Sequence, residues 1–207
     1  FNFGIFSKKN SYLVFIGNSL TERFNACHIN NTYSNLITKS LNGQNTEVEA
    51  RSGAMLNNII QSFKEITAID PKYAIINIGV NDAGQGVDSI DFINNLNLLS
   101  DSLIKNNIQP ILMTTQPWTD ASLHNDTIRY QYSRCILSDS NKYIVVNTYD
   151  SLVEPNTYVI QDKYTDGDGH PNELGHRKIA EILLNRLDTI LQIAGDKIID
   201  GNIYMPN

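Results

Sequence analysis

The sequence is poor in cysteine and in basic side chains, and it has no long apolar run. Its 2 cysteines, Cys27 and Cys135, are too few for a disulfide scaffold or a Cys-rich zinc site, and the sequence leaves open whether they form one bridge. The 16 Lys and Arg against 22 Asp and Glu disfavour electrostatic binding to nucleic acid or to anionic membrane surfaces. No stretch approaches the roughly 20 apolar residues that a membrane span requires.

What the sequence does contain is enough apolar material for one packed domain. It has 207 residues, of which 41% are hydrophobic, and that size suits a single domain. We expect this domain to cover residues 1–194. Residues 195–207 contain Gly195, Gly201 and Pro206 without helical periodicity, so we expect a C-terminal tail or linker. Because the chain starts at Phe1, we expect it to be part of a longer or processed protein.

Short runs rich in Val, Ile and Tyr alternate with longer amphipathic stretches along the chain. This alternation, with short connections, predicts a three-layer α/β/α sandwich around a five-stranded parallel sheet. Functional side chains are therefore expected just after strands, where open parallel sheets bind ligands. The predicted strands are 12–16, 47–50, 73–78, 110–114 and 143–147, and the predicted helices are 31–41, 56–66, 89–105, 127–137 and 174–191.

Three of the predicted strands lead into polar or glycine-containing segments. Ser19 follows the first strand, where its hydroxyl would lie at the rim of the sheet or cap a helical turn. Gly53 follows the second strand and permits close backbone approach, although a simple turn glycine is the alternative. Asn81 follows the third and would donate to an oxygen that gains negative charge, unless it and Asp82 are only turn residues.

A fourth candidate segment precedes the last helix. It contains His170 in a glycine-rich loop with Asp166 and Asp168 close by, which is the arrangement required for a general base held in one tautomer. The pattern completes neither a calcium loop nor a zinc signature, so we predict no metal site and no cofactor. We read His176 as a solvated helical residue, with positioning of the His170 loop as the alternative, and place His28 and His124 on the surface.

Together these four segments resemble the SGNH (GDSL-type) hydrolase superfamily, which is named for a Ser, a Gly, an Asn and a His in separate blocks. The resemblance covers about residues 12–191 and implies a flavodoxin-like SGNH hydrolase fold and a serine nucleophile. The four blocks are Gly17-Asn18-Ser19-Leu20, Gly53, Gly79-Val80-Asn81-Asp82 and Asp168-Gly169-His170-Pro171-Asn172. By this resemblance Ser19, Asp168 and His170 are the catalytic residues, and Ser19, Gly53 and Asn81 form the oxyanion hole.

The chain departs from the family pattern at two positions. Asn18 stands where the family usually has Asp, and we consider it a candidate substrate contact. The family's Asp commonly lies three residues before the His, and that position is Gly167 here. We favour Asp168 as the acid that orients His170 and keep Asp166 as the alternative.

The resemblance implies hydrolysis of a small acyl ester, with an O-acetylated carbohydrate as the leading substrate. Trp118 follows the fourth strand and would stack on a sugar ring, or it packs as an ordinary core residue. Two alternatives remain at this stage. One is an O-acyltransferase with the same Ser-His pair, and the other is a non-catalytic carbohydrate-binding or structural module on the same fold.

Overall fold

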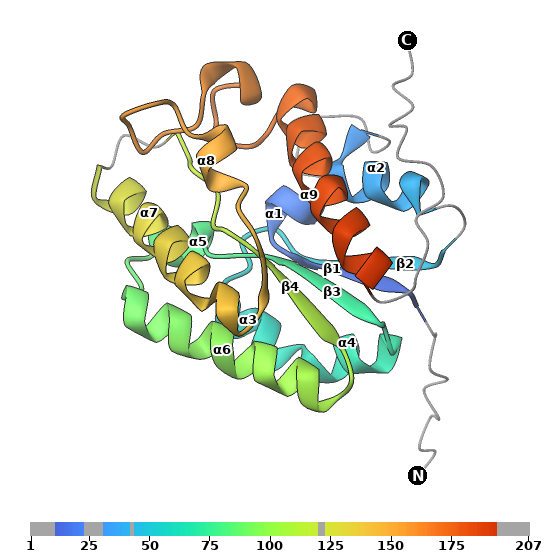
Figure 1. Cartoon of the computed structure of the whole chain (residues 1–207). Helices are drawn as coiled ribbons and strands as arrows, with labels where there is room; N and C mark the ends of the chain where they lie inside the picture. Colours follow the sequence, from blue (N-terminus) through green and yellow to red (C-terminus); the bar gives the residue numbers. More distant parts are fainter. Residues whose placement is uncertain (1–10, 23–30, 42–43, 120–122, 194–207) are drawn as a thin grey trace.

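The computed structural model describes residues 11–22, 31–41, 44–119 and 123–193 (Figure 1). Predictions about Cys27, His28 and the tail 195–207 lie outside the described residues. Within those ranges, no helix combines the length and the apolar character needed to cross a bilayer. His124 is exposed, as predicted from the sequence.

The core of the fold is a parallel five-stranded sheet with the order β2-β1-β3-β4-β5. The strand β2 is added on one side of β1, and β3 and the later strands are added on the other side, so the strand order reverses and creates a topological switch point beside β1. This confirms the predicted flavodoxin-like α/β architecture. The strands are β1 (Leu13–Gly17), β2 (Thr46–Ala50), β3 (Tyr73–Asn77), β4 (Gln109–Met113) and β5 (Ile144–Val146).

Helices cover both faces of the sheet (Figure 1). On one face lie α2 (Tyr33–Ser40), α8 (Tyr149–Leu152) and α9 (Glu173–Ile193). On the other lie α3 (Leu56–Gln61), α4 (Phe63–Ile69), α5 (Val80–Gly84), α6 (Ser89–Lys105) and α7 (Leu123–Ser138). The short helix α1 (Ser19–Glu22) follows β1, and the 3-10 turns η2 (Asp139–Asn141) and η3 (Asp162–Tyr164) lie in the later connections.

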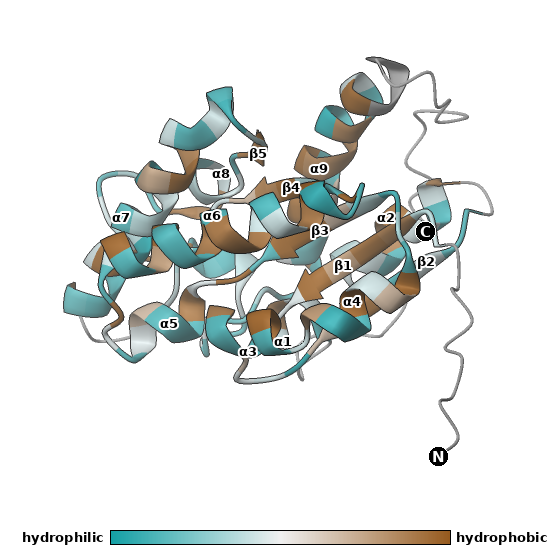
Figure 2. Cartoon of the chain, turned by 90° about the horizontal axis from the view of Figure 1, so that it is seen from below, coloured by the Kyte–Doolittle hydropathy of each residue, from teal (hydrophilic) through white to brown (hydrophobic). Residues whose placement is uncertain are grey.

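Successive residues of the buried strands point into two separate hydrophobic cores. Val14 and Ile16 face the core beneath α3 and α6, whereas Leu13 and Phe15 face the core beneath α2 and α9. The hydropathy colouring shows this arrangement, with brown strands enclosed between helices of mixed colour (Figure 2). Each fully buried aliphatic side chain contributes about 1.5–3 kcal/mol through removal of apolar surface from water. The two hydrophobic cores, to which both the strands and the helices contribute, are therefore the main source of stability.

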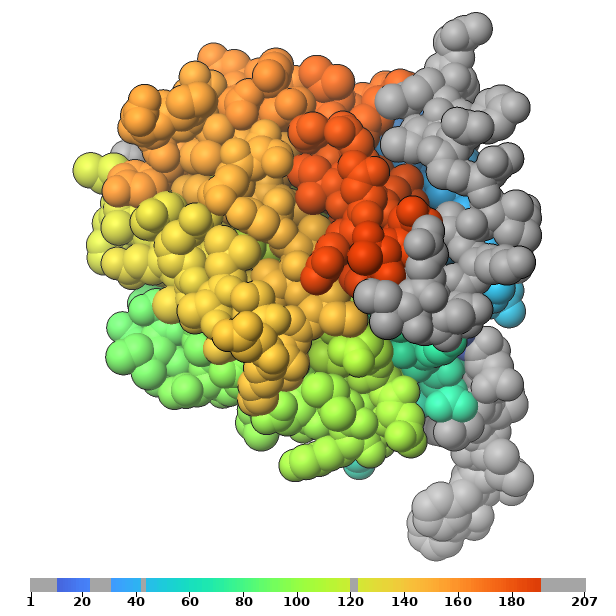
Figure 3. Space-filling model, viewed as in Figure 1, coloured from blue at the N-terminus to red at the C-terminus, as the bar shows by residue number. Residues whose placement is uncertain are grey.

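The structure differs from the sequence prediction in the segment after β2. The helix predicted over 56–66 is two helices, because Ser62 (φ -89°, ψ 15°) turns the chain between α3 and α4. The predicted helix 127–137 is longer and begins at Leu123. Helix α9 packs beside the segment that leads from β5 through α8 to η3, and the two are neighbours on the surface (Figure 3).

Strand register brings the candidate segments to one rim. Gly17, the last residue of β1, pairs with Ala50 of β2 and with Asn77 of β3. The three strands therefore end at the same level, and the residues that follow them emerge side by side. The sheet thereby gathers Ser19, the Gly53 loop and Asn81 from positions far apart in the sequence.

Candidate active site

Ser19 is the first residue of α1 and lies just beyond β1. Asn18 is the residue that caps this helix: its Oδ1 accepts the N–H of Leu20 at 3.0 Å, and its carbonyl accepts the N–H of Thr21 at 3.0 Å. The reading of Ser19 as an N-cap is therefore wrong. Because N–H groups at the start of a helix have no intrahelical acceptor, the N–H of Ser19 remains a donor at the rim of the sheet.

The prediction that Asn18 contacts the substrate is wrong. Its side chain is 0% exposed, and its oxygen is already committed to the cap of α1. A neutral amide performs this capping role without placing a charge in a fully buried position. The Asn that replaces the family's Asp at position 18 therefore acts by capping the helix that begins at Ser19.

Ser19 and His170 come together at this rim. The distance between Ser19 Oγ and His170 Nε2 is 3.0 Å, although the two residues are 151 positions apart. The His170 loop is held from within, because Thr165 Oγ1 accepts the N–H groups of Gly167 and Gly169 at 3.2 Å each. Asn172 ties the end of the loop to the start of α9 by accepting the N–H of Gly175 at 3.0 Å. This geometry permits direct proton transfer from a serine hydroxyl to an imidazole.

Asp168 is the carboxylate beside His170. Its Oδ2 lies 3.2 Å from His170 Nδ1, in ion-pair range but outside hydrogen-bond alignment, and its Oδ1 accepts the backbone N–H of His170 at 2.9 Å. The Asp168 side chain is 53% exposed, so solvent screens its charge. Asp166 is exposed to solvent.

His176 corrects the sequence reading, because it is buried rather than solvated. It is 3% exposed, its Nδ1 accepts the N–H of Tyr33 at 3.3 Å, and its ring stacks on that of Tyr33. Burial, together with repulsion from His170, lowers the pKa of His176 to about 4. A neutral imidazole therefore joins the start of α9 to α2. Sequence spacing contains no signal for this contact, since the partner is a backbone group 143 residues away along the chain.

Gly53 lies in the loop between β2 and α3, Asn81 lies at the start of α5, and hydrogen bonds join these two segments. Gly53 has a φ of +75°, which favours glycine. The Asn81 Nδ2 donates to the carbonyl of Ala54 at 2.9 Å, and the Asp82 carboxylate accepts the N–H of Leu56 at 3.0 Å. Burial raises the pKa of Asp82. An amide nitrogen carries two hydrogens, so Asn81 keeps one donor for a substrate oxygen.

Asp82 is thus a structural partner of the β2–α3 loop, contrary to the simpler reading as a local turn residue. It caps α3 from a different element, a role that sequence spacing does not reveal. A further tie comes from Glu22, whose carboxylate accepts the N–H of Ser52. The loop that carries Gly53 is therefore fixed to both α1 and α5.

Trp118 packs against the His170 loop and also borders an open hollow. A Cβ on Gly169 would lie 2.4 Å from ring atoms of Trp118, and the ring meets that of His170 edge-on at 4.8 Å. Much of the Trp118 ring is therefore in packing contacts, as the alternative prediction of an ordinary packed residue expected. The hollow lies beside Gly53 and Asn81 and is lined by Gly53, Met55, Val80, Asn81, Gly84, Gln85, Trp118 and Arg129.

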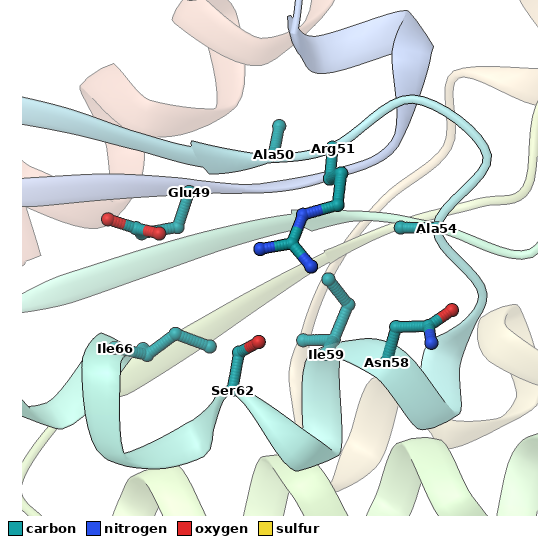
Figure 4. A pocket seen from close by; sticks show the side chains of 8 residues that line it. All are labelled: Glu49, Ala50, Arg51, Ala54, Asn58, Ile59, Ser62 and Ile66. Atoms are coloured by element: carbon teal, nitrogen blue, oxygen red, sulfur yellow. The ribbon is translucent and has the colours of Figure 1, made fainter.

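A second hollow lies beneath the β2–α3 connection, away from His170. The side chains of Arg51, Ile59 and Ser62 point into the space between β2 and the α3–α4 helices (Figure 4). Among the described residues, its lining includes neither Ser19, Gly53, Asn81 nor His170, although Arg51 and Ala54 belong to the same connection as Gly53. The candidate catalytic side chains therefore lie at the rim at Ser19 and not in this second hollow.

The described ranges contain no group of three or more His, Cys, Asp or Glu side chains arranged to hold a metal ion. The polar groups gathered at the rim are instead a hydroxyl, an imidazole, a carboxylate and amide donors. This donor set suits acyl transfer to a serine.

Comparison with known proteins agrees with this geometry. No curated protein sequence gives a significant match. Among solved structures, a GDSL-like lipase from Bacteroides thetaiotaomicron superposes with a TM-score of 0.73 at 20% identity, covering 87% of this chain and 89% of that one. A catalytic mutant of an acetylxylan esterase from Geobacillus stearothermophilus gives a TM-score of 0.70 at 18% identity, covering 94% and 99%.

The family assignment rests on the sequence itself. The pattern of the GDSL-like lipase/acylhydrolase family matches residues 15–178, a range that includes Ser19, Gly53, Asn81 and His170. That range is most of the chain, and the fold agrees with that of the solved structures. The chain therefore belongs to the GDSL-like lipase/acylhydrolase family and is an ester hydrolase of the SGNH type.

Proposed function

We propose that this protein is a serine esterase that removes small acyl groups, O-acetyl in particular, from carbohydrate through an acyl-enzyme on Ser19. The observation that carries the proposal is the 3.0 Å distance between Ser19 Oγ and His170 Nε2. A serine hydroxyl is a weak nucleophile until a base within hydrogen-bond reach takes its proton, and the imidazole is placed to do so.

In the first half-reaction, Ser19 Oγ attacks the ester carbonyl carbon as its proton passes to His170 Nε2. The carbonyl oxygen becomes negative and accepts hydrogen bonds from the N–H groups of Ser19 and Gly53 and from the Asn81 amide. His170 then gives its proton to the departing alcohol oxygen, and the C–O bond of the ester breaks. Water repeats the sequence on the acyl-enzyme and releases the acid.

Asp168 is the proposed orienting acid. An imidazolium at His170 gains a positive charge at Nδ1, 3.2 Å from the Asp168 carboxylate, and that charge is stabilised there. The hydrogen bond from the backbone N–H of His170 to Asp168 Oδ1 also holds the loop in the orientation that places the carboxylate beside the ring.

Two observations favour a small acyl group on a carbohydrate. The hollow beside the proposed oxyanion donors is lined by Asn81, Gln85 and Arg129 as well as by Trp118 and the apolar Met55 and Val80. Its polar groups suit a hydroxyl-rich substrate better than a long acyl chain. In addition, an acetylxylan esterase is among the proteins of similar fold.

Hydrolysis of p-nitrophenyl acetate tests the nucleophile directly. We expect purified protein to release p-nitrophenol and Ser19→Ala to lower kcat by roughly 10⁴–10⁶. Ser102→Ala, at an exposed hydroxyl of α6 that donates to the carbonyl of Leu98, serves as the matched control and should retain the wild-type rate. Turnover by Ser19→Ala at the wild-type rate contradicts the assignment. Analysis of products with an added sugar acceptor separates hydrolysis from acyl transfer, since both use the same acyl-enzyme.

A further inference from the structure

Trp118 packs against the loop that carries His170. This loop has two glycines with positive φ, +97° at Gly167 and +88° at Gly169. A Cβ on Gly169 would lie 2.4 Å from two carbons of the indole ring, whereas a Cβ on Gly167 would meet nothing within 4 Å. The indole therefore occupies the space that a side chain at position 169 would need, and the loop cannot move closer to Trp118 at this point.

The same tryptophan ring contacts the imidazole itself. The ring centres of Trp118 and His170 are 4.8 Å apart, and the ring planes meet at 71°, an edge-to-face geometry that aromatic pairs favour. The next residue adds a second tie, because Thr119 Oγ1 donates to the carbonyl of Gly167 at 3.3 Å. Two consecutive residues thus hold both the backbone of the loop and the ring of His170.

Trp118 is in turn held by other parts of the fold. Its carbonyl accepts the N–H of Ile160 at 3.2 Å, and it forms a parallel β-bridge with Val159. The guanidinium carbon of Arg129 lies 5.8 Å from the centre of the indole ring, and Arg129 is buried and paired with Asp126 at 2.7 Å. Because its backbone and its ring are both restrained, the indole is a rigid support for the loop.

The carboxylate beside His170 is a weaker support for the imidazole. The Asp168 side chain is 53% exposed, so solvent screens the attraction between its charge and the ring. Proton transfer over the 3.0 Å between Ser19 Oγ and His170 Nε2 nevertheless requires a defined ring position, and a displacement of about 1 Å in a reacting geometry costs about 10²-fold in rate. Packing against a rigid indole is not screened by solvent, so it supplies orientation that the exposed charge does not.

We propose that Trp118 is a positioning residue for the general base, whose indole ring holds His170 so that Nε2 stays within reach of Ser19 Oγ. This inference rests on the proposed function, because it assumes that His170 takes the proton of Ser19. The ring also borders the hollow, where stacking on a sugar is the other role open to it. A stacking role requires a carbohydrate substrate, whereas a positioning role affects every ester.

Hydrolysis of p-nitrophenyl acetate separates the two roles, because this ester carries no sugar. We expect Trp118→Leu to lower kcat by roughly 10–100-fold with KM within about threefold, since a misplaced base slows both half-reactions. Trp118→Phe keeps an aromatic ring and should retain at least about a third of the wild-type kcat. A loss confined to KM, or seen only with acetylated xylo-oligosaccharide, would assign Trp118 to substrate binding and overturn the proposal.

A double-mutant cycle tests the contact between the indole and the loop. Gly169→Ala places a methyl group against the ring and should lower kcat, whereas in the Trp118→Leu background its effect should be smaller by at least about fivefold. Gly167→Ala is the matched control, because it puts alanine at a similar positive φ in open space. Its effect should multiply with that of Trp118→Leu, since backbone strain alone cancels in the cycle. Equal coupling of the two glycines to Trp118, or none, would overturn the proposal.

An NMR measurement on the wild-type protein does not depend on the folding of any variant. Trp118 is the only tryptophan in the sequence, so its indole signals are unambiguous. We expect nuclear Overhauser effects between indole protons and the imidazole ring protons of His170, as the 4.8 Å separation of the ring centres requires. Their absence would overturn the proposal.

The outcomes distinguish this inference from the proposed function. Hydrolysis that does not depend on Ser19 refutes the proposed function itself. Hydrolysis that depends on Ser19 but proceeds with the wild-type kcat in Trp118→Leu refutes only the role of Trp118.

Discussion

Acidification should destabilise this protein through His176. Burial, with a smaller effect from His170, lowers the pKa of His176 from 6.5 to about 4 in the folded state. Between these two values the unfolded chain binds a proton that the folded chain excludes, so the free energy of unfolding rises with pH across this window. Integration of the two titrations gives a loss of about 2 kcal/mol at pH 5 relative to pH 8 from this single residue.

The measurement is urea unfolding followed by far-UV circular dichroism at pH 5 and pH 8 for the wild type and for His176→Asn. Asparagine offers an acceptor near the position of Nδ1, which takes the Tyr33 N–H in the wild type, but it does not titrate. We expect the variant to lose about 2 kcal/mol less than the wild type between the two pH values. His124→Asn, at the exposed start of α7, controls for loss of any histidine. If His176→Asn and the wild type show the same pH dependence, the reasoning is refuted.

Two further predictions concern the rim. Asn81→Ala should lower kcat for p-nitrophenyl acetate by about 10²–10³ with little change in KM, because it removes an oxyanion donor; an unchanged kcat would exclude the amide from that role. Asp168→Asn should lower kcat at least about tenfold, a modest loss because the carboxylate is half exposed, whereas Asp166→Asn should stay within about twofold. The opposite order of effects in a steady-state assay would assign the orienting acid to Asp166.

The architecture could be predicted from the sequence because its signals are local. Buried parallel strands are short apolar runs, and the helices between them have apolar residues at helical spacing. The edge strand β2 was recognisable despite its glutamates, because turn residues bound it. The break at Ser62 was not predictable, because it depends on how α3 and α4 each pack against the sheet rather than on a Gly or Pro in the sequence.

The residues of the candidate site could be predicted from the order of the motifs, but the residues that hold them in place could not. That Ser19, Gly53, Asn81 and His170 belong to one constellation follows from their blocks and from their positions after strands. The roles of Asn18 as a cap, His176 as a buried acceptor and Asp82 as a clamp did not follow. Each depends on a hydrogen bond to a backbone group whose position is set only when separate elements pack.

What the sequence determined by itself is therefore the alternation of elements and the family motifs that supply the candidate reactive side chains. The tertiary structure decided their distances: parallel register aligns the ends of β1, β2 and β3, and the packing of α9 returns His170 to within 3.0 Å of Ser19. It also decided that the Trp118 ring packs against Gly169 and His170. A residue's type records its chemistry, whereas its partners and its access to solvent are properties of the packed chain.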